Sequence, residues 1–152
     1  MSFTSVRILR LPHSEGLPLP SYQTDGASGM DVLAAVPADD PVILKPGERK
    51  LIPTGLTVSI PPNYEIQVRP RSGLAIKQGI TCLNTPGTID SDYRGEIQII
   101  LINLGHENAV ISRGMRIAQW VLSPVNKIQW VESEELDLTE RSSGGFGSTG
   151  IH

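Results

Sequence analysis

The segment Asp90-Ser91-Asp92-Tyr93-Arg94-Gly95 places two carboxylates, a phenol and a guanidinium close together in the sequence. Pro86-Gly87 precedes it and an alternating apolar run follows it, so we expect a loop or a hairpin tip. Acid–base catalysis needs a carboxylate within hydrogen-bond reach of water. Turns also recruit aspartate and serine for hydrogen bonds to the backbone. The segment therefore fits either a site that activates water or a structural turn.

A second polar group, Arg69-Pro70-Arg71-Ser72-Gly73, stands where a predicted strand meets a predicted short helix over residues 73–77. Free N–H groups at a helix start favour an anion, and arginine's planar fork suits phosphate. Ser72 is expected to be the N-cap of that helix. The alternative is a capping serine beside two surface arginines.

The C-terminal segment is rich in glycine and contains a formal GxGxxG pattern at Gly145, Gly147 and Gly150. A dinucleotide site needs a strand before these glycines and a helix after them, which this segment lacks. A flexible glycine-rich chain can still bring backbone N–H groups close to phosphates. The alternative is a mobile, solubilising tail. The side chains available for binding there are Arg141, Phe146, Ser148 and Thr149.

Three other polar residues carry weaker signals. Asp31 follows Ser28-Gly29-Met30 and precedes a predicted strand. Taken by itself, this acidic residue indicates only a turn. Arg116 and Gln119 are three residues apart, so in a regular strand they face opposite sides. The three histidines are scattered and Cys82 is the only cysteine, which argues against a zinc site.

The elements that position these residues are predicted to be strands. Fifteen glycines and twelve prolines separate short apolar stretches, and no helical periodicity exceeds about two turns. The pattern is that of an all-β sandwich, jelly roll or small barrel. The candidate strands are residues 57–60, 65–69, 96–102, 116–122 and 128–131.

Length and composition set limits on the class of protein. A chain of 152 residues with 39% apolar residues and a mean hydropathy of −0.07 suits one globular domain. The net charge of −3 argues against nucleic-acid binding, and no apolar run is long enough to cross a membrane. The single cysteine and the lack of a signal peptide predict a cytoplasmic location. The first twenty residues indicate no chemistry.

Five segments, taken together and in order, resemble the trimeric deoxyuridine triphosphatase (dUTPase) family. The resemblance runs from about Asp25 to Gly150. The segments are Ser28-Gly29-Met30-Asp31-Val32-Leu33-Ala34-Ala35, Arg69-Pro70-Arg71-Ser72-Gly73-Leu74-Ala75, Gly87-Thr88-Ile89-Asp90-Ser91-Asp92-Tyr93-Arg94-Gly95-Glu96, Arg113-Gly114-Met115-Arg116-Ile117-Ala118-Gln119, and Arg141-Ser142-Ser143-Gly144-Gly145-Phe146-Gly147-Ser148-Thr149-Gly150.

The resemblance implies an all-β distorted jelly roll with one short helix over residues 1–136. Residues 137–152 would form a flexible, glycine-rich C-terminal arm that closes over a neighbouring active site. It implies a homotrimer with shared active sites. The implied activity is Mg²⁺-dependent hydrolysis of dUTP to dUMP and pyrophosphate by in-line attack of water on the α-phosphorus. That reaction keeps uracil out of DNA and supplies dUMP for thymidylate synthesis.

The resemblance also implies roles for residues of the hairpin. Asp90 would orient and activate the attacking water and hold the sugar 3′-hydroxyl. Tyr93 would lie under the deoxyribose and leave no room for a 2′-hydroxyl. Asn84 would read the uracil edge. The main chain of Gly87, Thr88 and Ile89 would complete that reading.

The remaining roles concern the phosphates. Ser72, with Gly73, would bind the α/β region, and Gln119 would contact phosphate or an ordered water. Asp31 would hold Mg²⁺ through water. Arg71 would serve either the subunit junction or the phosphate rim. In the arm, Phe146 would stack on uracil, and Arg141, Gly147, Ser148 and Thr149 would bind at the γ-phosphate.

Three alternatives stay open at the level of sequence. A dCTP deaminase has the same architecture, but deamination often uses a glutamate, and residues 83–95 contain none. A nucleotide pyrophosphatase of relaxed specificity would not need Tyr93 and Asn84. A non-catalytic jelly-roll trimer that binds nucleotides would not need Asp90, Tyr93 or the arm.

Overall fold

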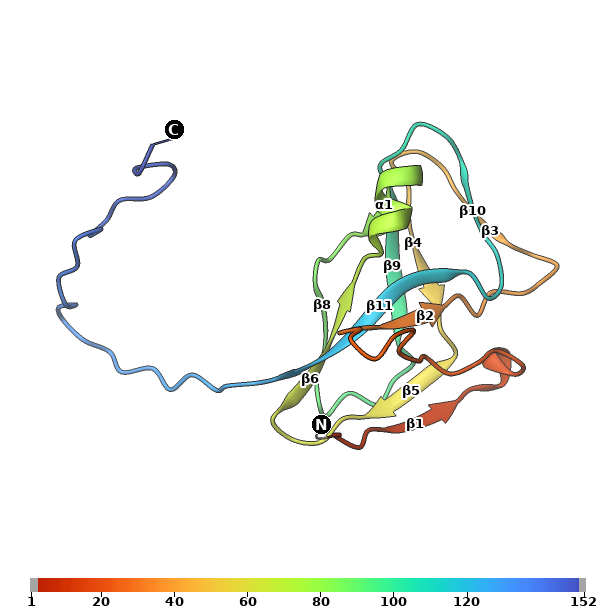
Figure 1. Ribbon diagram of the computed structural model, residues 1–152, viewed down its shortest axis with the longest axis horizontal. Coiled ribbons are helices and arrows are strands. Elements are labelled where there is room, and N and C mark those ends of the chain that lie inside the picture. The colour runs from red at the N-terminus through yellow and green to blue at the C-terminus, as the bar shows by residue number, and fades with distance from the viewer. Residues whose placement is uncertain (1–2, 151–152) are drawn as a thin grey trace.

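The computed structural model describes residues 3–150 of the chain, and it is built almost entirely from short strands (Figure 1). One 3-10 turn, η1 (Pro12–Ser14), and one short helix, α1 (Ser72–Gln78), interrupt them. The strands are β1 (Arg7–Arg10), β2 (Met30–Leu33), β3 (Val42–Leu44), β4 (Arg49–Pro53), β5 (Leu56–Ser59), β6 (Tyr64–Arg69), β7 (Ile80–Cys82), β8 (Gly87–Ile89), β9 (Gln98–Asn103), β10 (Ala109–Ile111) and β11 (Arg116–Pro124).

The strands form antiparallel sheets in the orders β2-β11-β6-β8, β4-β9-β7, β10-β3 and β1-β5. They surround one apolar core and do not close into a barrel. Most neighbouring strands in the sheets are far apart in the chain, as β11 beside β2 shows. The all-β prediction with one short helix is confirmed, and the arrangement is a distorted jelly roll.

Alternating side chains build the core, as the sequence pattern predicts. On β5, Leu56 and Val58 are buried while the residues between them face outward. On β9, Ile99 and Leu101 point inward. Asn103 at the end of β9 is fully buried, and its amide donates to the carbonyls of Leu44 and Glu107, both at 2.8 Å. A buried polar group is tolerated there because it is hydrogen-bonded.

Three local predictions are wrong. Residues 128–131 form no strand, and Trp130 in that stretch is 85% exposed. The strand expected from Glu96 begins two residues later, at Gln98. Ser72 is the first residue of α1, and the N-cap is Arg71, with no side-chain capping bond.

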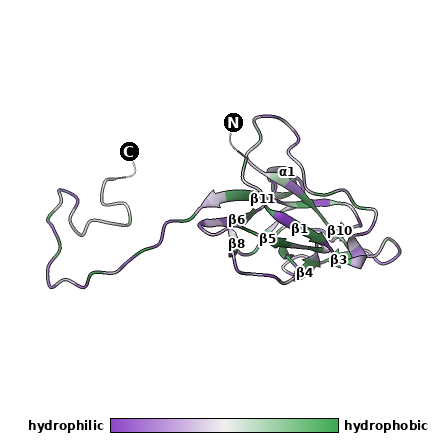
Figure 2. Cartoon of the chain, turned by 90° about the horizontal axis from the view of Figure 1, so that it is seen from below, coloured by the Kyte–Doolittle hydropathy of each residue, from purple (hydrophilic) through white to green (hydrophobic). Residues whose placement is uncertain are grey.

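The C-terminal segment leaves the body after β11. The amide of Val125 donates to the carbonyl of Asn63 at 2.8 Å. Residues 126–143 are all exposed and extend away from the strands (Figure 1). Figure 2 shows that hydrophobic segments concentrate in the strands of the body, whereas the tail is mixed or hydrophilic for much of its length. Within residues 3–150, no helix is long and apolar enough to cross a membrane.

Candidate active site

One cleft of about 290 Å³ brings together most of the hairpin residues singled out in the sequence. It lies between the β8 hairpin and the strands β4 and β9. Hydrophobic side chains such as Leu51 and Ile100 form part of its wall. The polar and hairpin residues that line it are Asn84, Gly87, Thr88, Ile89, Asp90, Tyr93 and Glu96.

The floor of this cleft is tightly packed around Gly87. Gly87 pairs with Val68 across β6 and β8. A Cβ atom at position 87 would lie 3.1 Å from both the Val68 Cβ and the Asn84 Nδ2. The close approach of these groups brings the Asn84 amide to the floor of the cleft. Asn84 itself stands on the exposed loop that joins β7 to β8, where the Thr85–Pro86 peptide bond is cis.

Asp90 and Tyr93 stand on one tight turn directly after β8. The amide of Tyr93 donates to the carbonyl of Asp90 at 3.2 Å. Arg94 closes the turn from outside, because its Nη1 donates to the carbonyls of Ser91 at 2.7 Å and Tyr93 at 2.9 Å. Hydrogen bonds to the backbone of this turn therefore fix the position of Asp90 relative to Tyr93.

The Tyr93 side chain folds back over Gly95. A Cβ atom at position 95 would lie 2.4 Å from the phenol oxygen and 2.6 Å from Cζ, so only glycine allows this packing. The hydroxyl donates to the backbone carbonyl of Glu96 at 2.9 Å. Sequence patterns gave Glu96 no role beyond starting a strand, although the structure places it in the cleft wall.

A second group of polar residues gathers where β2, β11 and the start of α1 meet. Asp31 pairs with Arg71 (Oδ1 to Nε, 3.0 Å) and with Arg116 (Oδ2 to Nη1, 3.5 Å). Arg71 also donates to the carbonyl of Arg116 at 3.3 Å. Gln119 donates to the carbonyl of Pro70 at 3.1 Å. We call these residues, together with the exposed Ser72 and Gly73, the arginine junction.

The prediction that Arg116 and Gln119 face opposite sides is wrong. The pairing of β11 with β2 shifts register between Arg116 and Ala118. Ile117 and Ala118 are consecutive buried residues, as expected where an extra residue interrupts strand alternation. The irregularity brings both polar side chains to the arginine junction.

The arm lies apart from both groups. Arg141 donates to the carbonyl of Gly144 at 2.9 Å, and Phe146 is completely exposed. No arm residue lines the cleft, nor does Asp31, Arg71, Ser72 or Gln119, among the residues that the structure describes. The predicted site residues of one chain therefore fall into three separate groups: the cleft, the arginine junction and the arm.

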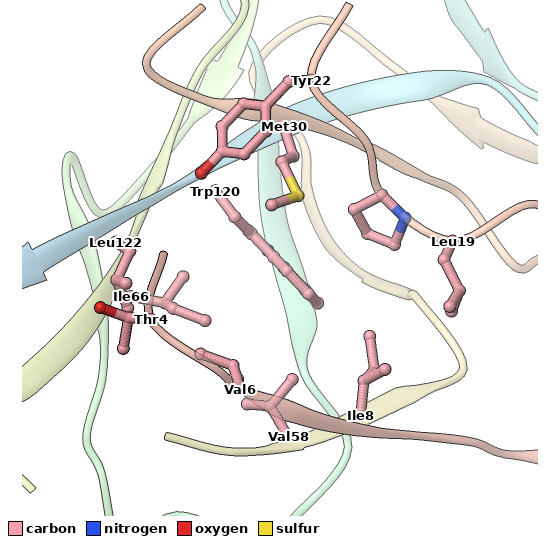
Figure 3. A pocket seen from close by; sticks show the side chains of 11 residues that line it. Thr4, Val6, Ile8, Leu19, Tyr22, Met30, Val58, Ile66, Trp120 and Leu122 are labelled. Carbon is pink, nitrogen blue, oxygen red and sulfur yellow. The ribbon is translucent and has the colours of Figure 1, made fainter. Parts of the chain in front are cut away.

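Two other features carry no acid–base chemistry. Burial raises the pKa of the Cys82 thiol to about 11, so this thiol stays protonated near neutral pH. A separate hollow of about 230 Å³ is lined mainly by apolar side chains, Trp120 and Met30 among them (Figure 3). It has no carboxylate and no base in its lining.

Comparisons with known proteins show the family of the chain. The family model described as dUTPase matches residues 15–150. The deoxyuridine 5′-triphosphate nucleotidohydrolase of Rhizobium meliloti (strain 1021) is 59% identical over 143 residues, covering 94% of this chain and 89% of the relative. That of Maricaulis maris (strain MCS10) is 56% identical over 150 residues and 99% of each chain.

A solved dUTPase structure has a similar fold. A mutant dUTPase of Staphylococcus bacteriophage 80alpha with dUpNHpp superimposes with a TM-score of 0.83 at 25% identity, covering 98% of this chain and 100% of the other. The fold and these comparisons place the chain among the jelly-roll nucleotide hydrolases. The chain belongs to the dUTPase family.

Proposed function

We propose that the chain hydrolyses dUTP to dUMP and pyrophosphate, with water attacking the α-phosphorus in line. The observation that carries this proposal is the single cleft in which Asn84, Asp90 and Tyr93 converge. Its volume of about 290 Å³ is sufficient for a pyrimidine nucleoside, and small-molecule sites begin near this size. The curated relatives bear the name of this activity.

Each residue of the cleft has a role in this reaction. The Asp90 carboxylate accepts a proton from the attacking water and hydrogen-bonds the sugar 3′-hydroxyl. Tyr93, packed on Gly95, closes the space where a 2′-hydroxyl would sit. The Asn84 amide and the main chain of Gly87, Thr88 and Ile89 read the uracil edge. To exclude thymine, the wall beside C5 of the base must be rigid, because one methyl group in a yielding pocket changes the binding free energy by only about 1–3 kcal/mol.

The arginine junction supplies positive charge for the triphosphate. Arg71 and Arg116 together outnumber the one carboxylate that pairs with them. Ser72 and Gly73 are exposed beside them, and a Cβ atom at position 73 would meet nothing within 4 Å. We assign Ser72 and Gln119 to hydrogen bonds with phosphate oxygens, and Arg71 to the phosphate rim. Charge placed before the reaction stabilises the developing pyrophosphate.

Magnesium fits this donor set in one way only. Within residues 3–150, no group of three or more histidine, cysteine, aspartate or glutamate side chains gathers to hold an ion. Asp31 is the carboxylate of the arginine junction, and two guanidiniums already bind it. Mg²⁺ keeps several waters and takes phosphate oxygens readily, so Asp31 would hold it through water. Bound in this way, Mg²⁺ neutralises charge on the triphosphate.

A homotrimer would bring the separated groups together. The outer face of the β4-β9-β7 sheet carries an apolar patch, because Leu51 and Leu83 are exposed there beside half-buried Ile100 and Ile102. Leu51 and Ile100 also form part of the cleft wall. A second copy packed on this face would therefore lie against the cleft. Its arginine junction would complete the phosphate end of the site.

The arm would complete the site from a neighbouring subunit. In one chain, Phe146 contacts nothing and its ring is free to stack on a base. Arg141, Gly147, Ser148 and Thr149 offer the guanidinium, N–H and hydroxyl donors that a γ-phosphate binds. We assign residues 1–136 to the domain and residues 137–152 to the arm. A cytoplasmic location stays our prediction from the single cysteine.

The test is pyrophosphate release with Mg²⁺ from dUTP, dCTP, dTTP and UTP in parallel, with ammonia measured in the dCTP reaction. We expect release from dUTP alone. Ammonia from dCTP would favour a deaminase. Equal release from all four would favour a pyrophosphatase of relaxed specificity. No reaction from a folded trimer would leave a nucleotide-binding protein without activity.

A further inference from the structure

Hydrogen bonds through Glu96 connect the phenol of Tyr93 to His13, which lies 83 positions before Glu96 in the sequence. His13, on the turn η1, hydrogen-bonds the Glu96 carboxylate through Nε2. The backbone carbonyl of the same Glu96 accepts the hydroxyl of Tyr93 at 2.9 Å. One residue thus joins the N-terminal turn to the wall of the nucleotide cleft.

Glu96 is held from two sides. Its Oε1 accepts from the Gly55 amide at 2.9 Å as well as from His13. Its side chain is 21% exposed, whereas the His13 ring is 42% exposed. The next residue is fixed independently, because Ile97 donates to the Leu56 carbonyl at 2.9 Å and accepts from the Thr54 hydroxyl at 2.6 Å. Loss of His13 would therefore loosen Glu96 without unravelling the strand behind it.

The turn that carries His13 is itself rigid. Arg113 donates to the carbonyls of His13 at 2.8 Å and Glu15 at 2.7 Å. Ser14 is buried against Gly55, where an added Cβ would lie 2.5 Å from the serine Cβ. The amide of Leu11 donates to the Gly55 carbonyl at 2.8 Å. Because these contacts fix the turn, the His13 ring can hold the Glu96 carboxylate in a defined position.

We propose that His13 is a positioning residue of the sugar pocket: through Glu96 it holds Tyr93 in the orientation that excludes a 2′-hydroxyl. The proposal rests on the proposed function, in which Tyr93 lies under the deoxyribose. Tyr93 is 46% exposed, so a contact that restricts its rotamers matters for selectivity. His13 touches no substrate and acts only through Glu96.

The test compares kcat/KM for dUTP and UTP in His13→Ala, His13→Gln and the control His106→Ala, whose histidine is exposed on the β9–β10 turn. We expect His13→Ala to raise the UTP-to-dUTP ratio about tenfold, the effect of roughly one hydrogen bond. His13→Gln keeps an N–H donor and should recover most of the selectivity. His106→Ala should match the unaltered chain. Thermal unfolding of each variant checks that it folds.

A double-mutant cycle with Tyr93→Phe separates positioning from general loosening. Tyr93→Phe removes the hydroxyl that Glu96 accepts, so His13→Ala should change the ratio no further in that background. An undiminished effect of His13→Ala in Tyr93→Phe would overturn the proposal. So would an unchanged ratio in His13→Ala alone.

A second readout does not depend on turnover. The chain has three tyrosines, so fluorine NMR of 3-fluorotyrosine-labelled protein can resolve Tyr93, assigned with Tyr93→Phe. We expect its resonance to shift and broaden in His13→Ala and to stay unchanged in His106→Ala. If the unaltered chain releases no pyrophosphate from dUTP, the proposed function fails, and this spectrum still decides whether His13 orders the phenol. An identical Tyr93 resonance in His13→Ala would refute it.

Discussion

Asp31 and Arg71 form an ion pair of 3.0 Å although forty residues separate them in the sequence. The pair joins strand β2 to the N-cap of helix α1, and Arg116 approaches the other carboxylate oxygen at 3.5 Å. One carboxylate therefore faces two guanidiniums at the place where we put the phosphates. This arrangement fixes Arg71 and leaves a net positive charge.

Asp31→Asn tests whether this carboxylate serves the metal as well as the arginines. The amide cannot neutralise charge or hold a hydrated cation as strongly, so we expect kcat/KM for dUTP to fall about tenfold. The Mg²⁺ concentration for half-maximal rate should rise. The measurement is a Mg²⁺ titration at fixed dUTP. Asp39→Asn, on an exposed loop, is the control, and an unaltered Mg²⁺ dependence in Asp31→Asn would remove Asp31 from the metal site.

Asp90→Asn tests the assignment of the base. The substitution keeps the size of the side chain but removes the proton acceptor, so kcat should fall by on the order of 10²–10⁴-fold. Affinity for a non-hydrolysable dUTP analogue, measured by titration calorimetry, should stay close to that of the unaltered chain. Asp92→Asn changes a carboxylate on the same turn and should retain activity. Equal losses in both variants would mean that the turn, and not Asp90, matters.

Gly95→Ala tests the packing of Tyr93. The added methyl would lie 2.4 Å from the phenol oxygen, so the ring must move. Because misplacement by about 1 Å can cost on the order of 10²-fold in rate, we expect a loss of one to two orders of magnitude in kcat/KM. Gly26→Ala is the matched control, since a Cβ at position 26 meets nothing within 4 Å. Full activity of Gly95→Ala would show that Tyr93 need not lie over Gly95.

Deletion of residues 141–152 tests the arm. Arm residues 141–143 and 146–150 are exposed and none lines the cleft, so the truncated chain should fold and assemble as a trimer. Turnover of dUTP should drop by at least about a hundredfold, because the base stacking and the γ-phosphate contacts are lost together. Light scattering reports assembly and pyrophosphate release reports activity. Leu136→Ala, an exposed change just before the arm, is the control. A truncated trimer with normal turnover would refute the role of the arm.

The sequence predicted the strands that carry clear alternation, such as β5 and β6, because one face of each packs on the core. It failed at residues 128–131, which have the same alternation but no partner strand in one chain. Trp130 and Val131 are exposed there. Alternation indicates residues that suit a half-buried strand, but it does not report whether a partner strand is present.

Asp90 and Tyr93 could be singled out because they lie in one short segment of polar residues, whereas Asn84 was found only through the family resemblance. The structure gathers all three in one cleft. Other features depend on contacts between distant segments. The expectation that the first twenty residues have no chemistry missed His13, which reaches Glu96 across 83 positions. The register shift that places Arg116 at the arginine junction also depends on the pairing of β11 with β2. No local pattern reports either contact.

We propose that water attacks the α-phosphorus of dUTP in a site built around Asp90. The most direct measurement is turnover of dUTP with Mg²⁺ in ¹⁸O-labelled water, followed by mass spectrometry of both products. We expect dUMP carrying one ¹⁸O atom and unlabelled pyrophosphate, and Asp90→Asn should form labelled dUMP on the order of 10²–10⁴-fold more slowly. Label in pyrophosphate with unlabelled dUMP would place the attack at the β-phosphorus and overturn the assignment of the α-phosphorus, as would the absence of dUMP.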